Sequence, residues 1–130
     1  MPAPGPAHGD VMAKILLAED ENALRAVLAR SLRGRGHAVT DVADGVEALE
    51  HLKPGAFDAL VADIVMPRLD GLELARRASQ AVPGIRVMFI TGFAAVALQA
   101  RALPDINARV LSKPFHLRDL VDELGRLLAA

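Results

Sequence analysis

The chain has 130 residues and a formal net charge of −1, from 15 Lys and Arg against 16 Asp and Glu. It contains no Cys, Trp or Tyr, which excludes disulfide bonds, thiol catalysis and thiolate metal sites and argues against an aromatic platform for nucleic-acid bases. Although 52% of the residues are hydrophobic, charges interrupt every apolar run before the ~18 residues that a membrane span needs. We therefore expect one cytoplasmic, monomeric domain that binds neither nucleic acid nor membrane.

The chain begins with a segment unlike the rest. Residues 1–12 are rich in Pro and Gly, lack apolar periodicity and lack the basic start and apolar centre of a signal peptide. We expect a disordered tail here and a folded domain over residues 13–130. The sequence leaves open whether residues 1–11 are native or whether translation begins at Met12.

From Lys14 onward, short aliphatic runs alternate with longer segments of helical period. Three of the five runs are apolar without alternation, which is typical of strands buried on both faces of a parallel sheet. The runs predicted to be strands are residues 15–18, 38–42, 59–62, 87–90 and 108–111.

Apolar residues at helical spacing predict a helix after each run except the fourth, where the Ala-rich residues 94–102 lack a clear apolar stripe and are assigned as a short helix. Asp44 and Asp70, each followed three residues later by Glu, are typical first-turn caps, while Gly34, Gly36, Gly55 and Pro83-Gly84 mark helix ends. The predicted helical segments are residues 24–32, 46–52, 72–78, 94–102 and 117–128. Together these elements predict an α/β fold, a doubly wound five-stranded parallel sheet with helices on both faces.

Polar side chains follow the predicted strands where each strand ends. Glu19 and Asp20 follow the first run, Asp63 the third, Thr91 the fourth and Lys113 the fifth. The carboxyl ends of parallel strands share one edge of the sheet, so we expect these side chains to meet there. Neighbouring carboxylates repel one another and need a cation, and hard oxygen ligands favour Mg²⁺.

This constellation predicts phosphoryl transfer to a carboxylate. Asp63 is the candidate nucleophile because aspartate can form an acyl phosphate, and an ionised carboxylate needs no general base. Lys113 would neutralise charge on the phosphoryl group, and Thr91 would donate a hydrogen bond to one of its oxygens.

With these residues the sequence resembles the receiver domain of two-component response regulators, over about residues 14–128. The resemblance rests on four motifs in order: Glu19-Asp20, Asp63 to Gly71, Phe89 to Gly92, and Leu111 to Phe115. It implies a CheY-like (flavodoxin-like) fold with strand order 2-1-3-4-5. It also implies phosphorylation of Asp63 by a histidine kinase or histidine phosphotransferase.

The resemblance carries a ligand set as well. It implies Mg²⁺ held by Asp20, Asp63 and the backbone carbonyl of Val65, with Glu19 acting through water. It further implies a cis peptide bond before Pro114, which would aim Lys113 at the site.

Within the family, three segments are similar to stand-alone receivers of alphaproteobacterial cell-cycle signalling: residues 63–67, 87–98 and 110–120. This implies input through a histidine phosphotransferase and output in regulated proteolysis by ClpXP, with ClpX and protease substrates as partners. The terminal Ala129-Ala130 is similar to the small apolar tails that ClpX-type unfoldases engage; a frayed helix end is the alternative.

One position departs from the family pattern. Receivers commonly place Tyr or Phe three residues before the fifth-strand lysine as a rotameric switch, whereas this chain has Val110. Phe93, two residues after Thr91, is a substitute switch candidate, and Phe115 is a candidate for a partner-facing surface. For both phenylalanines, ordinary packing is the alternative.

The sequence leaves two other functions open. The chain could be a phosphate shuttle or sink without an adaptor role. An aspartate-based phosphohydrolase would use the same nucleophile but typically needs a second Asp two residues later, where this chain has Val65. We therefore expect a signalling protein that is not an enzyme and that catalyses at most its own dephosphorylation.

Overall fold

The structure is a computed structural model that describes residues 12–101, 106 and 108–129. In these ranges five strands alternate with five helices. The strands are β1 (Lys14–Ala18), β2 (Ala38–Val42), β3 (Ala59–Asp63), β4 (Arg86–Thr91) and β5 (Ala108–Ser112). The helices are α1 (Asn22–Gly34), α2 (Gly45–Leu49), α3 (Gly71–Ala81), α4 (Ala94–Arg101) and α5 (Leu117–Ala129). Except for Met12, the expected tail lies outside the described residues.

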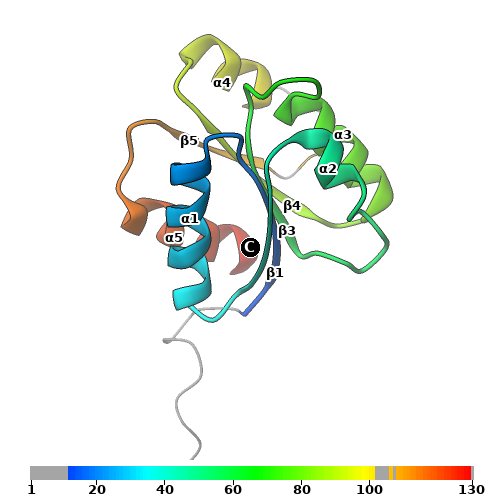
Figure 1. The fold of residues 1–130 in the computed structure, drawn as a ribbon, viewed down its shortest axis with the longest axis horizontal. Helices are drawn as coiled ribbons and strands as arrows, with labels where there is room; N and C mark the ends of the chain where they lie inside the picture. The colour runs from blue at the N-terminus through cyan, green and yellow to red at the C-terminus, as the bar shows by residue number, and fades with distance from the viewer. Residues whose placement is uncertain (1–11, 102–105, 107, 130) are drawn as a thin grey trace, which may run out of the picture.

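All strands pair in parallel in one sheet of order β2-β1-β3-β4-β5 (Figure 1). This is the predicted order. Ala18, the last residue of β1, pairs with Val42 and Ala62, so the carboxyl ends of these strands lie at one edge of the sheet. The order changes direction between β1 and β3, which is where a ligand site is expected in such a sheet.

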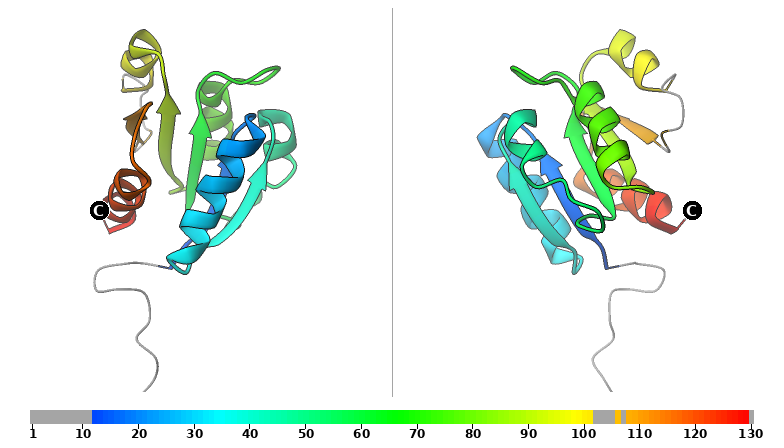
Figure 2. Two further views of the ribbon diagram at one scale, coloured as in Figure 1. Left: turned by 60° about the vertical axis from the view of Figure 1, so that its left-hand side comes forward. Right: turned by 90° about the vertical axis from the view of Figure 1, so that its right-hand side faces the viewer.

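Helices cover both faces of the sheet (Figure 2). Side chains alternate along each strand: Leu16 and Leu60 pack toward α2, α3 and α4, whereas Leu17 and Val61 pack toward α1 and α5. Both cores therefore use the same strands, which explains the runs without apolar alternation. Every residue of β3 is buried, whereas β2 and β5, at the edges, are only partly buried.

Helix boundaries follow the predicted capping residues. The Asp44 and Asp70 carboxylates each accept a hydrogen bond of 2.8 Å from the backbone N–H three residues later. The end of α2 was predicted wrongly, since the helix ends at Leu49 and not near Leu52. The chain continues in tighter turns, with the Leu52 N–H bonded to the Leu49 carbonyl, because Pro54 disfavours helical backbone just before it. No helix in the described ranges is long and apolar enough to span a membrane.

Candidate phosphoryl-acceptor site

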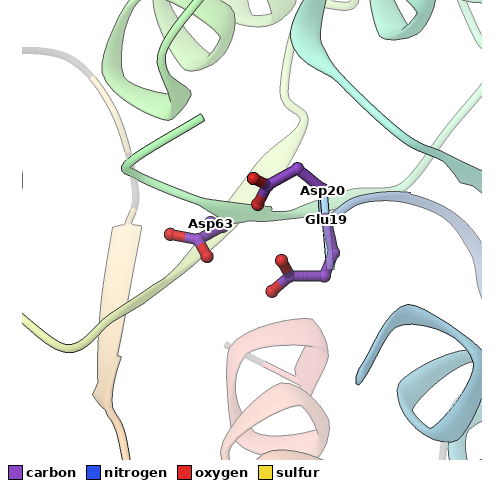
Figure 3. Close-up of side chains that lie close together, drawn as sticks. All are labelled: Glu19, Asp20 and Asp63. Atoms are coloured by element: carbon purple, nitrogen blue, oxygen red, sulfur yellow. The ribbon is translucent and has the colours of Figure 1, made fainter. Parts of the chain in front are cut away.

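Three carboxylates converge at the carboxyl edge of the central strands (Figure 3). Glu19 and Asp20 directly follow β1, and Asp63 is the last residue of β3. Candidate ligand oxygens from the three side chains lie within 4.8 Å of one another. Glu19 is fully buried and Asp63 is 6% exposed, whereas Asp20 is exposed to solvent. The structure thus brings together all the acids that the sequence placed at this edge.

Lys113 reaches this cluster from the loop after β5. Its Nζ lies 2.8 Å from Asp63 Oδ2 and 3.5 Å from Glu19 Oε1. The Lys113 backbone N–H donates to the Thr91 carbonyl at 2.8 Å, which joins this loop to the end of β4. The Lys113–Pro114 peptide bond is cis. Lys113 is therefore in position to balance negative charge at Asp63.

The site holds more negative charge than Lys113 can neutralise. Burial, more than any other effect, and the nearby Asp63 charge together raise the pKa of Glu19 to about 7, against the hydrogen bond from the Glu21 N–H and the charge of Lys113. Burial lowers the pKa of Lys113, but its hydrogen bond to Asp63 and the charges of Asp63 and Glu19 outweigh that effect and raise it overall. A divalent cation would relieve the remaining repulsion, so the donor set fits Mg²⁺.

The carboxylate of Asp63 is held from two directions. Its Oδ1 accepts the Val65 N–H at 3.0 Å, and its Oδ2 accepts from Lys113. These bonds fix the plane of the carboxylate and therefore the direction in which an Asp63 oxygen can attack an incoming group. The Val65 side chain, which stands where a phosphohydrolase would have its second acid, is 48% exposed.

Thr91 ends β4 beside this cluster and is 1% exposed. Its Oγ1 accepts the Phe93 N–H at 3.0 Å, which leaves the hydroxyl proton to donate elsewhere. Phe93 itself is 59% exposed. A group that binds the Thr91 hydroxyl and moves it would therefore also move the Phe93 backbone, and with it the exposed Phe93 side chain.

Two residues that shape the site were missed by the sequence analysis as functional residues. Arg25 of α1 donates to the Glu19 carbonyl at 2.9 Å and lies 3.4 Å from Asp41, and no local motif marks it. A Cβ on Gly71 would lie 2.4 Å from the Asp63 carbonyl oxygen, so only glycine fits at the start of α3. Its place directly after the Asp70 cap was visible in the sequence, but the close approach was not.

The remaining predicted residues lie around the site or at the end of the chain. Val110 is half-buried and packs toward the α2, α3 and α4 face. Phe115 is half-buried, and its side chain packs in part against the α1 and α5 core. Ala129 is exposed at the end of α5, and Ala130 lies outside the described residues.

Comparison with known proteins agrees with this geometry. The model of the response regulator receiver domain matches residues 15–125. The chain belongs to this family. It is 51% identical to the response regulator receiver protein CpdR of Brucella abortus over 119 residues, which cover 92% of this chain and 99% of CpdR.

Solved receivers share the fold. The chemotaxis protein CheY4 of Vibrio cholerae is 26% identical with a TM-score of 0.76, and the match covers 90% of this chain and 99% of CheY4. The receiver domain of the sensor histidine kinase PA1611 of Pseudomonas aeruginosa, described with magnesium coordinated in its active site cleft, is 30% identical with a TM-score of 0.77. That match covers 92% of this chain and 100% of the other. The fold is therefore CheY-like, as predicted.

Proposed function

We propose that Asp63 of this response regulator accepts a phosphoryl group from a phosphohistidine of a histidine kinase or histidine phosphotransferase. The observation that carries the proposal is the contact of Lys113 Nζ with both Asp63 and Glu19, which sets one cation against two buried carboxylates. Family membership supports it, since receiver domains receive phosphoryl groups from such donors.

The transfer is written as an in-line displacement. An Asp63 carboxylate oxygen attacks phosphorus, a P–O bond forms, the P–N bond to the donor imidazole breaks, and the imidazole nitrogen takes up the electron pair. Lys113 balances charge next to the attacked group, and the Thr91 hydroxyl donates to a phosphoryl oxygen. Asp20, Asp63 and the Val65 carbonyl, with Glu19 through water, would hold Mg²⁺, which supplies positive charge to the phosphoryl oxygens.

Phosphorylation with acetyl phosphate or a purified histidine phosphotransferase tests this assignment. We expect Asp63→Asn to abolish labelling while the protein stays folded, and chelation of Mg²⁺ to stop labelling of the wild type. Asp20→Ala should weaken Mg²⁺ binding more than Glu19→Ala. Strong labelling of Asp63→Asn, or equal rates with and without a chelator, would contradict the proposal.

We propose further that the output is phosphorylation-controlled delivery of substrates to ClpXP. Support comes from the resemblance to stand-alone receivers of proteolytic control and from 51% identity to CpdR along nearly its whole length. The exposed side chains of Phe93 (59%) and Leu98 (67%) offer a contact surface linked to Thr91 through the Phe93 N–H. The unphosphorylated form would dock on ClpX, and phosphorylation would weaken docking.

Degradation by purified ClpXP tests the output. We compare wild type, the Ala129→Asp/Ala130→Asp variant and the phosphorylated protein, and expect only the unmodified wild type to be degraded rapidly. A tenfold change in docking corresponds to about 1.4 kcal/mol of differential affinity. Equal half-lives without ClpX binding would leave the phosphate shuttle as the function, whereas multiple turnover of small phosphate esters would indicate a phosphohydrolase.

A further inference from the structure

The loop between β3 and α3, residues 64–70, holds the phosphoryl-acceptor carboxylate in place. The Val65 N–H donates to Asp63 Oδ1 at 3.0 Å. The loop is closed by a 2.8 Å bond from the Gly71 N–H to the Ile64 carbonyl. A shift of this loop at Val65 therefore moves the donor that orients Asp63.

Arg68, near the far end of the loop, has a backbone conformation that residues other than glycine rarely adopt. Its φ is +70°, and it is the only described residue other than glycine with a positive φ. In this region the Cβ crowds the following carbonyl oxygen, so surrounding contacts must hold the conformation. Such strain next to a reactive group often has a functional role.

The side chain of Arg68 binds Asp44. One carboxylate oxygen of Asp44 caps α2 by accepting the Glu47 N–H at 2.8 Å, and the other accepts from the Arg68 guanidinium. The Asp44 side chain is only 12% exposed, which limits screening of this ion pair by water, although the Arg68 side chain is 63% exposed. The Glu47 N–H and then the Arg68 guanidinium keep the pKa of Asp44 below its ordinary value.

A second contact fixes the same part of the loop. A Cβ on Gly45 would lie 2.7 Å from the Leu69 carbonyl oxygen, so the Leu69 backbone lies directly against the first residue of α2. The loop is thus held on α2 at consecutive residues, by the Arg68 side chain and the Leu69 backbone. Its opposite end carries the Val65 N–H.

We propose that the Asp44–Arg68 ion pair positions the phosphoryl-acceptor site by holding the β3–α3 loop on the start of α2. Without the pair, the loop can move away from α2, and the Val65 N–H no longer holds Asp63 Oδ1 in one orientation. Arg68 is a positioning residue in this scheme, because it acts through the loop and does not contact Asp63. The inference rests on the proposed role of Asp63 and its Mg²⁺ site.

Three variants separate the ion pair from the backbone conformation. Arg68→Ala removes the guanidinium and leaves the strain at φ +70°. Arg68→Gly also removes the guanidinium but relieves the strain, because glycine adopts positive φ readily. Asp44→Ser keeps a good helix cap but is too short to reach Arg68. Arg76→Ala, which breaks an exposed ion pair with Glu73 on α3, is the matched control.

The readouts are the Mg²⁺ dissociation constant of the unphosphorylated full chain, from calorimetric titration, and the NMR shift of the Val65 amide. We expect Arg68→Gly and Asp44→Ser each to raise the dissociation constant roughly tenfold, the scale typical of residues that orient metal ligands. The Val65 amide should shift in both variants. The double variant should bind no more weakly than either single variant, because both changes remove one interaction. Arg76→Ala should bind as the wild type does.

Wild-type Mg²⁺ affinity in Arg68→Gly would overturn the inference, since the backbone conformation alone would then suffice. Additive losses in the double variant would overturn it as well, because the residues would then act separately. If Arg68→Ala does not fold, Arg68→Gly and Asp44→Ser still decide the question. Failure of the wild type itself to bind Mg²⁺ would instead contradict the proposed function.

Discussion

The helices on the two faces of the sheet differ in length and in how well they are buried. On one face α1 and α5 have 13 residues each and place a row of aliphatic side chains in the core. On the other, α3 has 11 residues and buries four of them, but α2 has 5 residues and α4 has 8, and α4 exposes Leu98 at 67%. We infer that α1 and α5 form a rigid cover and that α4 is the part of the opposite face that can adjust.

The site lies between these halves of the molecule. Arg25 of α1 braces the Glu19 carbonyl, on the side of the longer helices. Val65 and Phe93, whose N–H groups bond to Asp63 and Thr91, belong to the segments that lead into α3 and α4. A phosphoryl group on Asp63 would thus be held in place on the α1 side and would displace the segments that lead into α3 and α4. The following predictions test this division, from the largest expected effect to the smallest.

Truncation of an apolar side chain should cost much more stability in α5 than in α4. Leu124→Ala removes a fully buried side chain of α5 and should lower the free energy of unfolding by about 3 kcal/mol. Leu98→Ala removes an exposed side chain of α4 and should change it by less than about 0.5 kcal/mol. Urea denaturation measures both values. Equal losses would show that α4 is as tightly packed as α5.

Glycine substitutions provide a second contrast. Gly71→Ala should destabilise the protein by about 2 kcal/mol and slow phosphorylation, because the new Cβ would lie 2.4 Å from the Asp63 carbonyl oxygen. Gly125→Ala in α5 meets no atom within 4 Å and should stabilise the protein by about 0.5–1 kcal/mol through helix propensity. Thermal denaturation and the rate of labelling by acetyl phosphate check the pair. Unchanged labelling in folded Gly71→Ala would contradict the close approach.

Stability should depend on pH through Glu19. Burial raises the pKa of Glu19 from 4.5 to about 7, so between these values the folded protein holds a proton that the unfolded chain has lost. In the presence of EDTA, the contribution of Glu19 to the free energy of unfolding should therefore be most favourable below about pH 4.5. It should fall, on the order of 2 kcal/mol, as pH rises through 7. Saturating Mg²⁺ should reduce the fall.

Glu19→Gln is the control for this pH dependence, because it keeps an oxygen that can accept the Glu21 N–H. Denaturant titrations between pH 5 and 8, in paired samples of wild type and variant, measure the difference. The same slope in both proteins would assign the pH dependence to another group.

The smallest effect concerns Val110, which packs toward the face that α2, α3 and α4 cover. Val110→Ala should cost about 1 kcal/mol of stability, as a partly buried truncation does. The difference in ClpX binding between phosphorylated and unphosphorylated forms should persist, because we expect the signal to pass through Thr91 and Phe93. Loss of that difference in a folded variant would make residue 110 the switch.

Much of the fold was predictable because the local signals agree with one another. Runs such as Ala59 to Ala62, apolar without alternation, are explained by a sheet with a core on each face. Asp44 and Asp70 marked the starts of α2 and α3. The end of α2 was predicted wrongly because Leu52 keeps its apolar contacts in a tighter turn, which the spacing of apolar residues does not distinguish from a helix.

The sequence by itself determined the order of elements and the convergence of Glu19, Asp63 and Lys113, because a parallel sheet places the carboxyl ends of its strands at one edge. Only the tertiary structure decided the contacts around them. Asp44 and Arg68 are 24 residues apart, and their pairing depends on how the β3–α3 loop lies on α2. The full burial of Glu19 likewise arises from chain segments that meet only after folding, and it is this burial that raises its pKa.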